Sequence, residues 1–153
     1  MWVMRATADR DRSTSLLPYL STSLPSVLLI DDEPGIRFAL RRWFERQGWT
    51  VQESGDGEDA LARLLSVSDD GDDRFDLVIC DVNLPKRSGA SLVNALKSDR
   101  PAMATRVILS TGDDVEDAAP GTMLQSYPNI LQKPFDLSTL RALVERVARP
   151  ASA

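Results

Sequence analysis

Polar residues whose side chains could do chemistry stand where the apolar runs of this chain end. They follow or close the runs "SVLLI", "FDLVIC", "RVILST" and "NILQ". These residues are Asp31, Asp32, Asp81, Ser110, Thr111 and Lys133. If the runs are neighbouring strands of one sheet, three carboxylates, a hydroxyl and an ammonium group meet at one rim.

Three carboxylates brought together repel one another by about 4 kcal/mol per close pair at an effective dielectric constant of about 20. A hard divalent cation such as Mg²⁺ relieves this repulsion because it prefers oxygen ligands and takes few protein carboxylates. A carboxylate beside such an ion can attack phosphorus and form an aspartyl phosphate. The ammonium of Lys133 could neutralise phosphoryl oxygens, and the hydroxyl of Thr111 could donate a hydrogen bond to one of them.

The residues before these polar groups have the pattern of buried strands. The runs are apolar throughout rather than at every second position, which is typical of a parallel sheet covered on both faces. Stretches with helical spacing lie between and after them, at about 34–47, 58–65, 91–98 and 137–147. A fifth, shorter run, "TVQES", is expected to be a peripheral strand, so the sequence predicts an α/β fold, a doubly wound five-stranded parallel sheet flanked by helices. Such sheets bind ligands beyond the carboxyl ends of their strands, where the polar residues collect.

The composition of the 153-residue chain narrows the classes of function. Acidic residues outnumber basic ones by 23 to 18, which argues against a nucleic-acid partner. The chain has no histidine, so a Ser-His-Asp triad, a His-ligated zinc site and a phosphohistidine on this chain are excluded. The single cysteine suits a reducing compartment, and no apolar run approaches membrane-spanning length. We therefore expect a cytoplasmic protein with no membrane partner.

Four motifs in order carry a family resemblance. "LLIDDEPG", "LVICDVNLPKRSG", "VILSTG" and "LQKPFDLSTL" together resemble the receiver domain of two-component response regulators, a CheY-like family. The resemblance runs from about Val27 to Ala148 and implies a flavodoxin-like sheet with strand order 2-1-3-4-5. It also implies a signalling protein rather than an enzyme.

The resemblance implies a role for each polar residue. Asp81 occupies the place of the phosphoacceptor, with Thr111 and Lys133 beside the phosphoryl group. The Mg²⁺ ligands of the family correspond to Asp31, Asp32, Asp81 and the backbone carbonyl of Asn83. The Lys133–Pro134 bond is expected to be cis, as in the family. Because this chain has no histidine, the phosphodonor must act in trans, either a sensor histidine kinase or a phosphotransfer protein.

Two departures from the family pattern affect the region before Lys133. Ile130 stands where the family places its switch aromatic, so the usual coupling between hydroxyl and aromatic ring is in doubt. Pro120 and Gly121 interrupt the segment that should hold the fourth helix, which we expect to be short or irregular. Both departures lie on a surface that many receivers use for output, so we expect a monomer or a weak dimer.

We expect residues 1–24 to be a flexible leader, 25–149 the receiver domain and 150–153 a short tail. The expected function is that of a single-domain response regulator that accepts a phosphoryl group on Asp81 and signals to a downstream protein. One alternative is a docking scaffold that works without phosphorylation. A second is an aspartyl-phosphate phosphohydrolase, which would need an acid two residues after the nucleophile; Asn83 stands there and cannot protonate a leaving group.

Overall fold

The computed structural model describes residues 24–69, 71–112 and 123–148. Within these residues five strands form one sheet in the order β3-β2-β4-β5-β6, and every neighbouring pair is parallel. The strands are β2 (Ser26–Ile30), β3 (Thr50–Ser54), β4 (Leu77–Asp81), β5 (Val107–Thr111) and β6 (Ile130–Gln132). In chain order this is 2-1-3-4-5, so the predicted sheet is confirmed.

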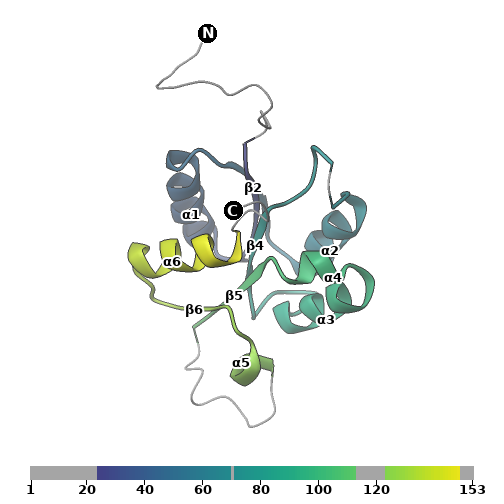
Figure 1. Cartoon of the computed structure of the whole chain (residues 1–153). Coiled ribbons are helices and arrows are strands. Elements are labelled where there is room, and N and C mark those ends of the chain that lie inside the picture. The colour runs from purple at the N-terminus through teal and green to yellow at the C-terminus, as the bar shows by residue number, and fades with distance from the viewer. Residues whose placement is uncertain (1–23, 70, 113–122, 149–153) are drawn as a thin grey trace.

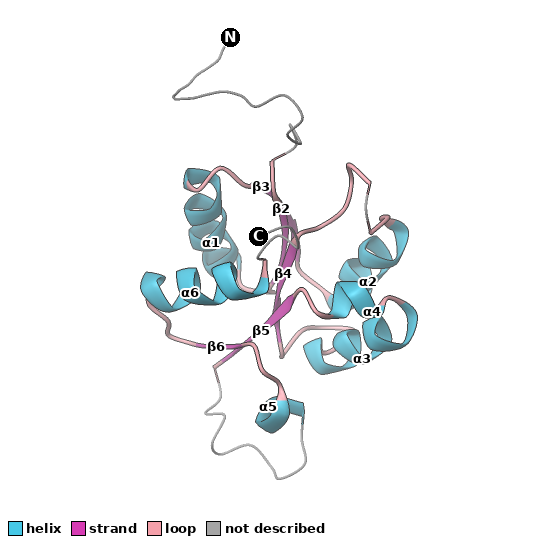
Figure 2. Cartoon of the chain, in the orientation of Figure 1, coloured by secondary structure: helices cyan, strands magenta, loops and turns pink. Residues whose placement is uncertain are grey.

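Helices cover both faces of the sheet, as a doubly wound fold requires. They are α1 (Pro34–Arg46), α2 (Gly57–Ser66), α3 (Gly89–Asp99), α4 (Pro101–Ala104), α5 (Met123–Ser126) and α6 (Leu137–Val147). Helices α1 and α6 lie on one side of the sheet, and α2, α3 and α4 lie on the other (Figures 1 and 2). The chain alternates between strand and helix, so each strand end is followed by a loop at the same rim of the sheet.

Each face of the sheet buries its own apolar cluster, because successive side chains of a strand point to opposite faces. The cluster under α1 and α6 includes Val27, Leu29, Leu40, Phe44, Leu77, Ile79, Ile108, Leu131 and Leu140. The cluster under α2, α3 and α4 includes Leu28, Ile30, Leu64, Val78, Cys80, Leu92, Leu96, Met103 and Leu109. The two clusters hold the strands in a fixed register, and that register fixes which strand ends are neighbours.

Three helices begin with a side-chain cap, whereas α1 and α4 do not. Asp56, Ser88 and Asp136 cap α2, α3 and α6, and each side chain accepts a bond from the backbone N–H three residues later. At α1 the N-cap residue is Glu33, whose side chain makes no capping bond, and Pro34 fills the first helical position. The side chain of Glu33 is therefore available for another contact.

The predicted short or irregular fourth helix falls in a segment that the structure describes only in part. In the described part of this segment α5 is a four-residue helix, and residues 113–122 lie outside the described residues. Ile130 is the first residue of β6 and packs against the cluster under α2, α3 and α4. Just before it, the hydroxyl of Tyr127 donates to the backbone carbonyl of Val107 at 2.7 Å.

The predicted leader and tail fall almost wholly outside the described residues; of residues 1–24, only Leu24 is described. No helix among the residues that the structure covers is both long and apolar enough to cross a membrane.

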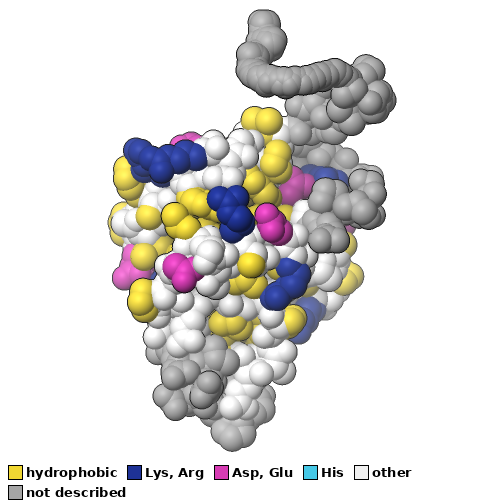
Figure 3. All heavy atoms as spheres, turned by 60° about the vertical axis from the view of Figure 1, so that its left-hand side comes forward, with side chains coloured by type: hydrophobic (Ala, Val, Ile, Leu, Met, Phe, Trp, Pro, Cys, Tyr) yellow, Lys and Arg dark blue, Asp and Glu magenta, His cyan; other side chains and the backbone are white. Residues whose placement is uncertain are grey.

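The face that carries α1 and α6 mixes hydrophobic side chains with single acidic and basic ones (Figure 3). Phe38 and Leu137 are exposed, and the guanidinium of Arg42 lies 5.7 Å from the centre of the Phe38 ring.

Candidate functional site

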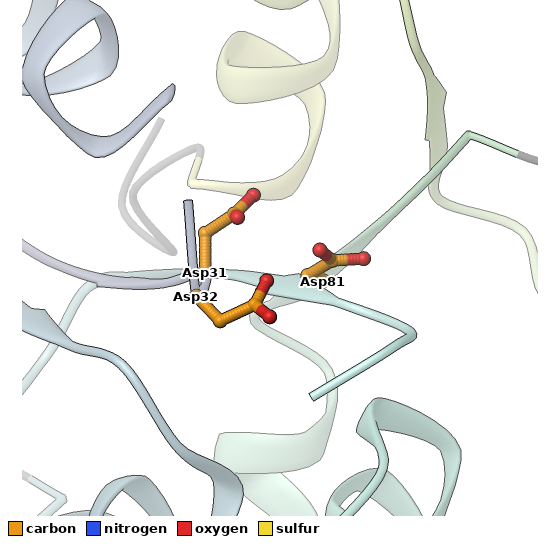
Figure 4. Close-up of side chains that lie close together, drawn as sticks. All are labelled: Asp31, Asp32 and Asp81. Atoms are coloured by element: carbon orange, nitrogen blue, oxygen red, sulfur yellow. The ribbon is translucent and has the colours of Figure 1, made fainter. Parts of the chain in front are cut away.

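Two neighbouring strand ends bring the three aspartates together. Strand β2 pairs with β4, with Ile30 opposite Cys80, so the next residues, Asp31 and Asp81, emerge side by side. Asp31, Asp32 and Asp81 each offer a carboxylate oxygen, and these oxygens lie within 4.8 Å of one another. Figure 4 shows the three side chains extending from the adjoining strand ends. Asp31 and Asp81 are buried, whereas Asp32 is exposed.

Lys133 brings its ammonium group to the same place from the loop after β6. Its Nζ donates to Asp31 Oδ2 at 2.9 Å and to Asp81 Oδ2 at 3.3 Å. It also contacts Glu33 Oε1 at 3.4 Å. The lysine backbone is fixed as well, because its N–H donates to the carbonyl of Thr111 at 2.7 Å, and the Lys133–Pro134 bond is cis as expected.

The site carries more negative charge than its lysine can balance, and the pKa values of its groups reflect this. Burial is the main cause that raises the pKa of Asp81, and the neighbouring charge of Asp31 raises it further. A bond from the Asn83 backbone N–H to Asp81 Oδ1, at 3.1 Å, and the ammonium of Lys133 both oppose this rise. For Lys133, desolvation lowers the pKa, but Asp31 and Asp81 outweigh it and the net pKa is raised.

The raised pKa of Asp81 predicts how stability depends on pH. A carboxyl whose pKa is higher in the folded state stabilises the fold below its ordinary pKa of about 4, and this contribution is lost as the pH rises through the folded value. Asp81→Asn removes the titration, so the variant should gain stability relative to the natural chain between pH 4 and pH 7. Urea denaturation in EDTA at pH 4 and pH 7 gives the free energy of unfolding of both proteins. If the difference between variant and natural chain were the same at the two pH values, the prediction would be wrong.

The loop after Asp81 follows a close path around the aspartate. At Gly89, a Cβ atom would lie 2.5 Å from the backbone oxygen of Asp81, so only glycine fits there without movement. The Gly89 N–H donates to the carbonyl of Val82 at 2.9 Å. Lys86 lies at the tip of this loop with a φ of 72°, a conformation that costs a non-glycine residue energy. The loop thereby fixes the backbone on both sides of Asn83.

The turn after β2 is held by an arginine of α1. Arg37 donates to the backbone carbonyl of Asp31, and its Nε pairs with Glu53 Oε1 at 2.9 Å. Glu53 also pairs with Arg41, and the two arginines lower its pKa. This pairing ties the turn that carries Asp31 to the edge strand β3. Both arginines are therefore bound to other groups of the same domain.

Thr111 and Ser110 end β5 next to the acidic cluster. Thr111 is fully buried at the carboxyl end of its strand, where the sequence predicts it. Ser110 pairs with Asp81 across the sheet and lies on the same face as Ile108, toward α1 and α6. In the described part of the chain, the buried hydroxyl of Ser110 has no hydrogen-bond partner.

Ser110→Ala should therefore stabilise the fold or leave it unchanged. A buried hydroxyl without a partner carries a desolvation cost of about 1–3 kcal/mol, and its removal leaves only a small void. We expect a gain of up to about 1 kcal/mol in the free energy of unfolding, measured by urea denaturation. Ser126→Ala, in which an exposed hydroxyl is lost, is the control; a clear loss of stability at Ser110 would mean that its hydroxyl has a partner.

The donor set of the cluster fits Mg²⁺. All three side chains supply hard carboxylate oxygens, and Mg²⁺ is held in proteins by a few such oxygens together with water. The three carboxylates therefore form a donor set that suits Mg²⁺.

Most of the site residues that the sequence predicts converge in the structure. Lys133 contacts Asp31 and Asp81 directly, Asp32 lies close to both aspartates, and Asn83 joins through its backbone N–H. Thr111 reaches the group through its carbonyl, which accepts from Lys133. Sequence reasoning assigned no role to Glu33, although it stands directly after the acidic pair. Its side chain makes no capping bond and so can reach Lys133, which becomes clear only when the start of α1 is known.

Comparison with known proteins agrees with this geometry. The sequence matches the family model for the response regulator receiver domain over residues 27–145. It is 31% identical over 125 residues to the probable transcriptional regulatory protein TcrX of Mycobacterium tuberculosis, covering 79% of this chain and 50% of that protein. The chain spans about half or less of the length of the curated relatives it matches.

Solved structures give the same result for the fold. A response regulator receiver protein from Pseudomonas putida has a TM-score of 0.66 and 29% identity, covering 83% of this chain and 99% of that one. The response regulator TrrA of Thermotoga maritima, in complex with Mg²⁺-BeF, has a TM-score of 0.67 and 24% identity, covering 80% and 98%. With its sheet order, its acidic rim and the family match over most of its length, the chain belongs to the response regulator receiver domain family.

Proposed function

We propose that Asp81 accepts a phosphoryl group from a phosphohistidine on another protein and that the chain signals through protein contacts. Receiver domains are signalling modules that partner histidine kinases, not classical enzymes. The observation that carries the proposal is the position of Lys133, whose Nζ contacts both Asp31 and Asp81 within the acidic triad. A sensor histidine kinase or a phosphotransfer protein would be the donor, and a further protein the target.

The proposed step is a transfer of one phosphoryl group between two side chains. A carboxylate oxygen of Asp81 attacks phosphorus, the new O–P bond forms, and the P–N bond to the donor imidazole breaks. The electron pair of that bond stays on the imidazole nitrogen, which takes up a proton. Lys133 neutralises charge on the phosphoryl oxygens, and the hydroxyl of Thr111 supplies a hydrogen bond.

The electrostatics of the site support Asp81 as the acceptor. Asp81 is buried and is bound by the Asn83 N–H on one oxygen and by Lys133 on the other, so its orientation is set before the donor arrives. Asp31 is held in the same way, by the Glu33 N–H on one oxygen and by Lys133 on the other, each at 2.9 Å, and Asp32 is exposed. The choice of Asp81 rather than Asp31 therefore rests on the motif "CDVNLP", in which Asp81 matches the phosphoacceptor of the family.

Mg²⁺, when bound, neutralises the developing charge on the phosphoryl oxygens. The residues that would hold it are Asp31, Asp32 and Asp81, with the backbone carbonyl of Asn83 as a fourth ligand. A structure with this fold, TrrA, was obtained in complex with Mg²⁺-BeF. This supports an assignment of Mg²⁺ rather than a softer metal, which would favour sulfur or imidazole ligands.

Intact-mass measurement tests the proposal directly. The protein is incubated with acetyl phosphate and either MgCl₂ or EDTA. We expect a gain of one phosphoryl group with Mg²⁺ and none with EDTA, because the acidic triad must be neutralised before an anionic donor can approach. No uptake under either condition, from small donors and phosphohistidine proteins alike, would favour the docking scaffold that works without phosphorylation.

A further inference from the structure

Glu33 directly follows the acidic pair, but it neither belongs to the carboxylate triad nor caps its own helix. Its Oε1 lies 3.4 Å from Lys133 Nζ, and its side chain is 63% exposed. The two other acids on this lysine, Asp31 and Asp81, have side chains that are only 5% and 8% exposed. Glu33 therefore stands on the solvent side of the ammonium group, where a phosphodonor must enter.

Glu33 and a phosphoryl group near Asp81 compete for one cation. The same Nζ contacts Asp81 Oδ2 at 3.3 Å and Glu33 Oε1 at 3.4 Å, so the two carboxylate oxygens are no farther apart than these distances combined. A phosphoryl group that is transferred to Asp81 is anionic and would need the same ammonium group as its counter-charge. Glu33 thus repels the donor through its own charge and also holds part of the positive charge that the donor needs.

We propose that Glu33 is a positioning residue that acts through Lys133 and makes phosphorylation selective for donors of low negative charge. This inference rests on the proposed function, because it concerns the rate at which Asp81 is phosphorylated. A doubly charged donor is repelled about twice as strongly as a singly charged one at the same distance. The natural chain should therefore discriminate against small dianionic donors, which protects Asp81 from phosphorylation by metabolites.

The same contact has the opposite effect on Mg²⁺. Without the carboxylate of Glu33, the site loses negative potential, and Lys133 binds Asp31 and Asp81 with less competition. Both changes weaken the binding of a cation to the triad. Removal of Glu33 should therefore weaken Mg²⁺ binding while it accelerates phosphorylation at saturating Mg²⁺. A variant that merely loosened the site would lower both.

Glu33→Gln is the test, with phosphorylation of Asp81 followed by intact mass at pH 7 and saturating MgCl₂. Acetyl phosphate, a dianion, should react about fivefold faster than with the natural chain, and phosphoramidate, largely a monoanion, about twofold faster. Added salt should reduce both gains. Isothermal titration calorimetry with MgCl₂ alone should show binding weaker by about two- to threefold.

Two variants separate charge from structure. Glu45→Gln removes the same charge from the exposed part of α1, where Glu45 pairs with Arg41, and should behave as the natural chain does. Glu33→Asp keeps the charge and should keep the discrimination between donors. Equal rate changes for the two donors, or tighter Mg²⁺ binding in Glu33→Gln, would overturn the inference alone. A natural chain that takes up no phosphoryl group from any donor would overturn the proposed function, and this inference with it.

Discussion

Asp81→Asn should reduce phosphoryl uptake from acetyl phosphate to the limit of detection, although the variant folds. An amide has nearly the shape of a carboxylate but is a far weaker nucleophile, and Asp81 is the proposed nucleophile, oriented by the Asn83 N–H and by Lys133. The amide oxygen can still accept the Asn83 N–H bond. Because the variant also removes a buried negative charge, its free energy of unfolding at neutral pH should not fall.

The control for this variant is Asp72→Asn, which makes the same chemical change at an exposed aspartate of the loop before β4. It should take up one phosphoryl group as the natural chain does. Intact mass followed by peptide mapping identifies the modified residue. Sustained phosphorylation of Asp81→Asn at another aspartate would show that the nucleophile has been assigned wrongly.

The position of the site could be predicted from sequence because it depends on a rule of the fold. Strands that are apolar throughout must lie inside a parallel sheet, and the carboxyl ends of neighbouring parallel strands meet at one rim. This reasoning placed Asp31 beside Asp81 without knowledge of any distance, and the register of β2 and β4 confirms it. The same rule places Lys133 at this rim because β6 also ends there, but its contact with Asp81 requires the side chain to reach past β5.

Contacts that depend on side-chain reach could not be predicted in this way. The pairing of Glu33 with Lys133 requires the start of α1 to leave that side chain uncapped, which no residue pattern specifies. Arg37 has the spacing of a solvated helix face, yet it turns back to the carbonyl of Asp31. Whether the hydroxyl of Ser110 has a hydrogen-bond partner depends on which side chains of α1 and α6 lie over the end of β5. Periodicity identifies a face but does not give the distances across it.

Lys133 is expected to matter for stability as much as for chemistry, since among the described residues it is the one cation that forms an ion pair with the carboxylates of the triad. Lys133→Met keeps most of the side-chain volume and removes the charge. Asp31 and Asp81 are then buried without a counter-charge, and removing one partner of a buried ion pair costs about 3–5 kcal/mol. We expect the free energy of unfolding to fall by about 2–3 kcal/mol in EDTA at pH 7. The loss is smaller than for a fully buried pair because solvent reaches the site at the exposed Asp32.

Mg²⁺ should recover much of this loss, and that recovery separates the electrostatic role of Lys133 from simple packing. A ligand that binds only the folded state stabilises it more when it binds more tightly, and the triad without its lysine should bind a cation more tightly. Urea denaturation with and without MgCl₂ should therefore show a larger Mg²⁺ effect in Lys133→Met than in the natural chain. Lys97→Met, at an exposed lysine of α3, controls for the loss of one positive charge. If Lys133→Met were as stable as the natural chain in EDTA, the ammonium group would contribute nothing to holding the acids together. If Mg²⁺ stabilised both proteins equally, the lysine and the metal would not compete for the same carboxylates.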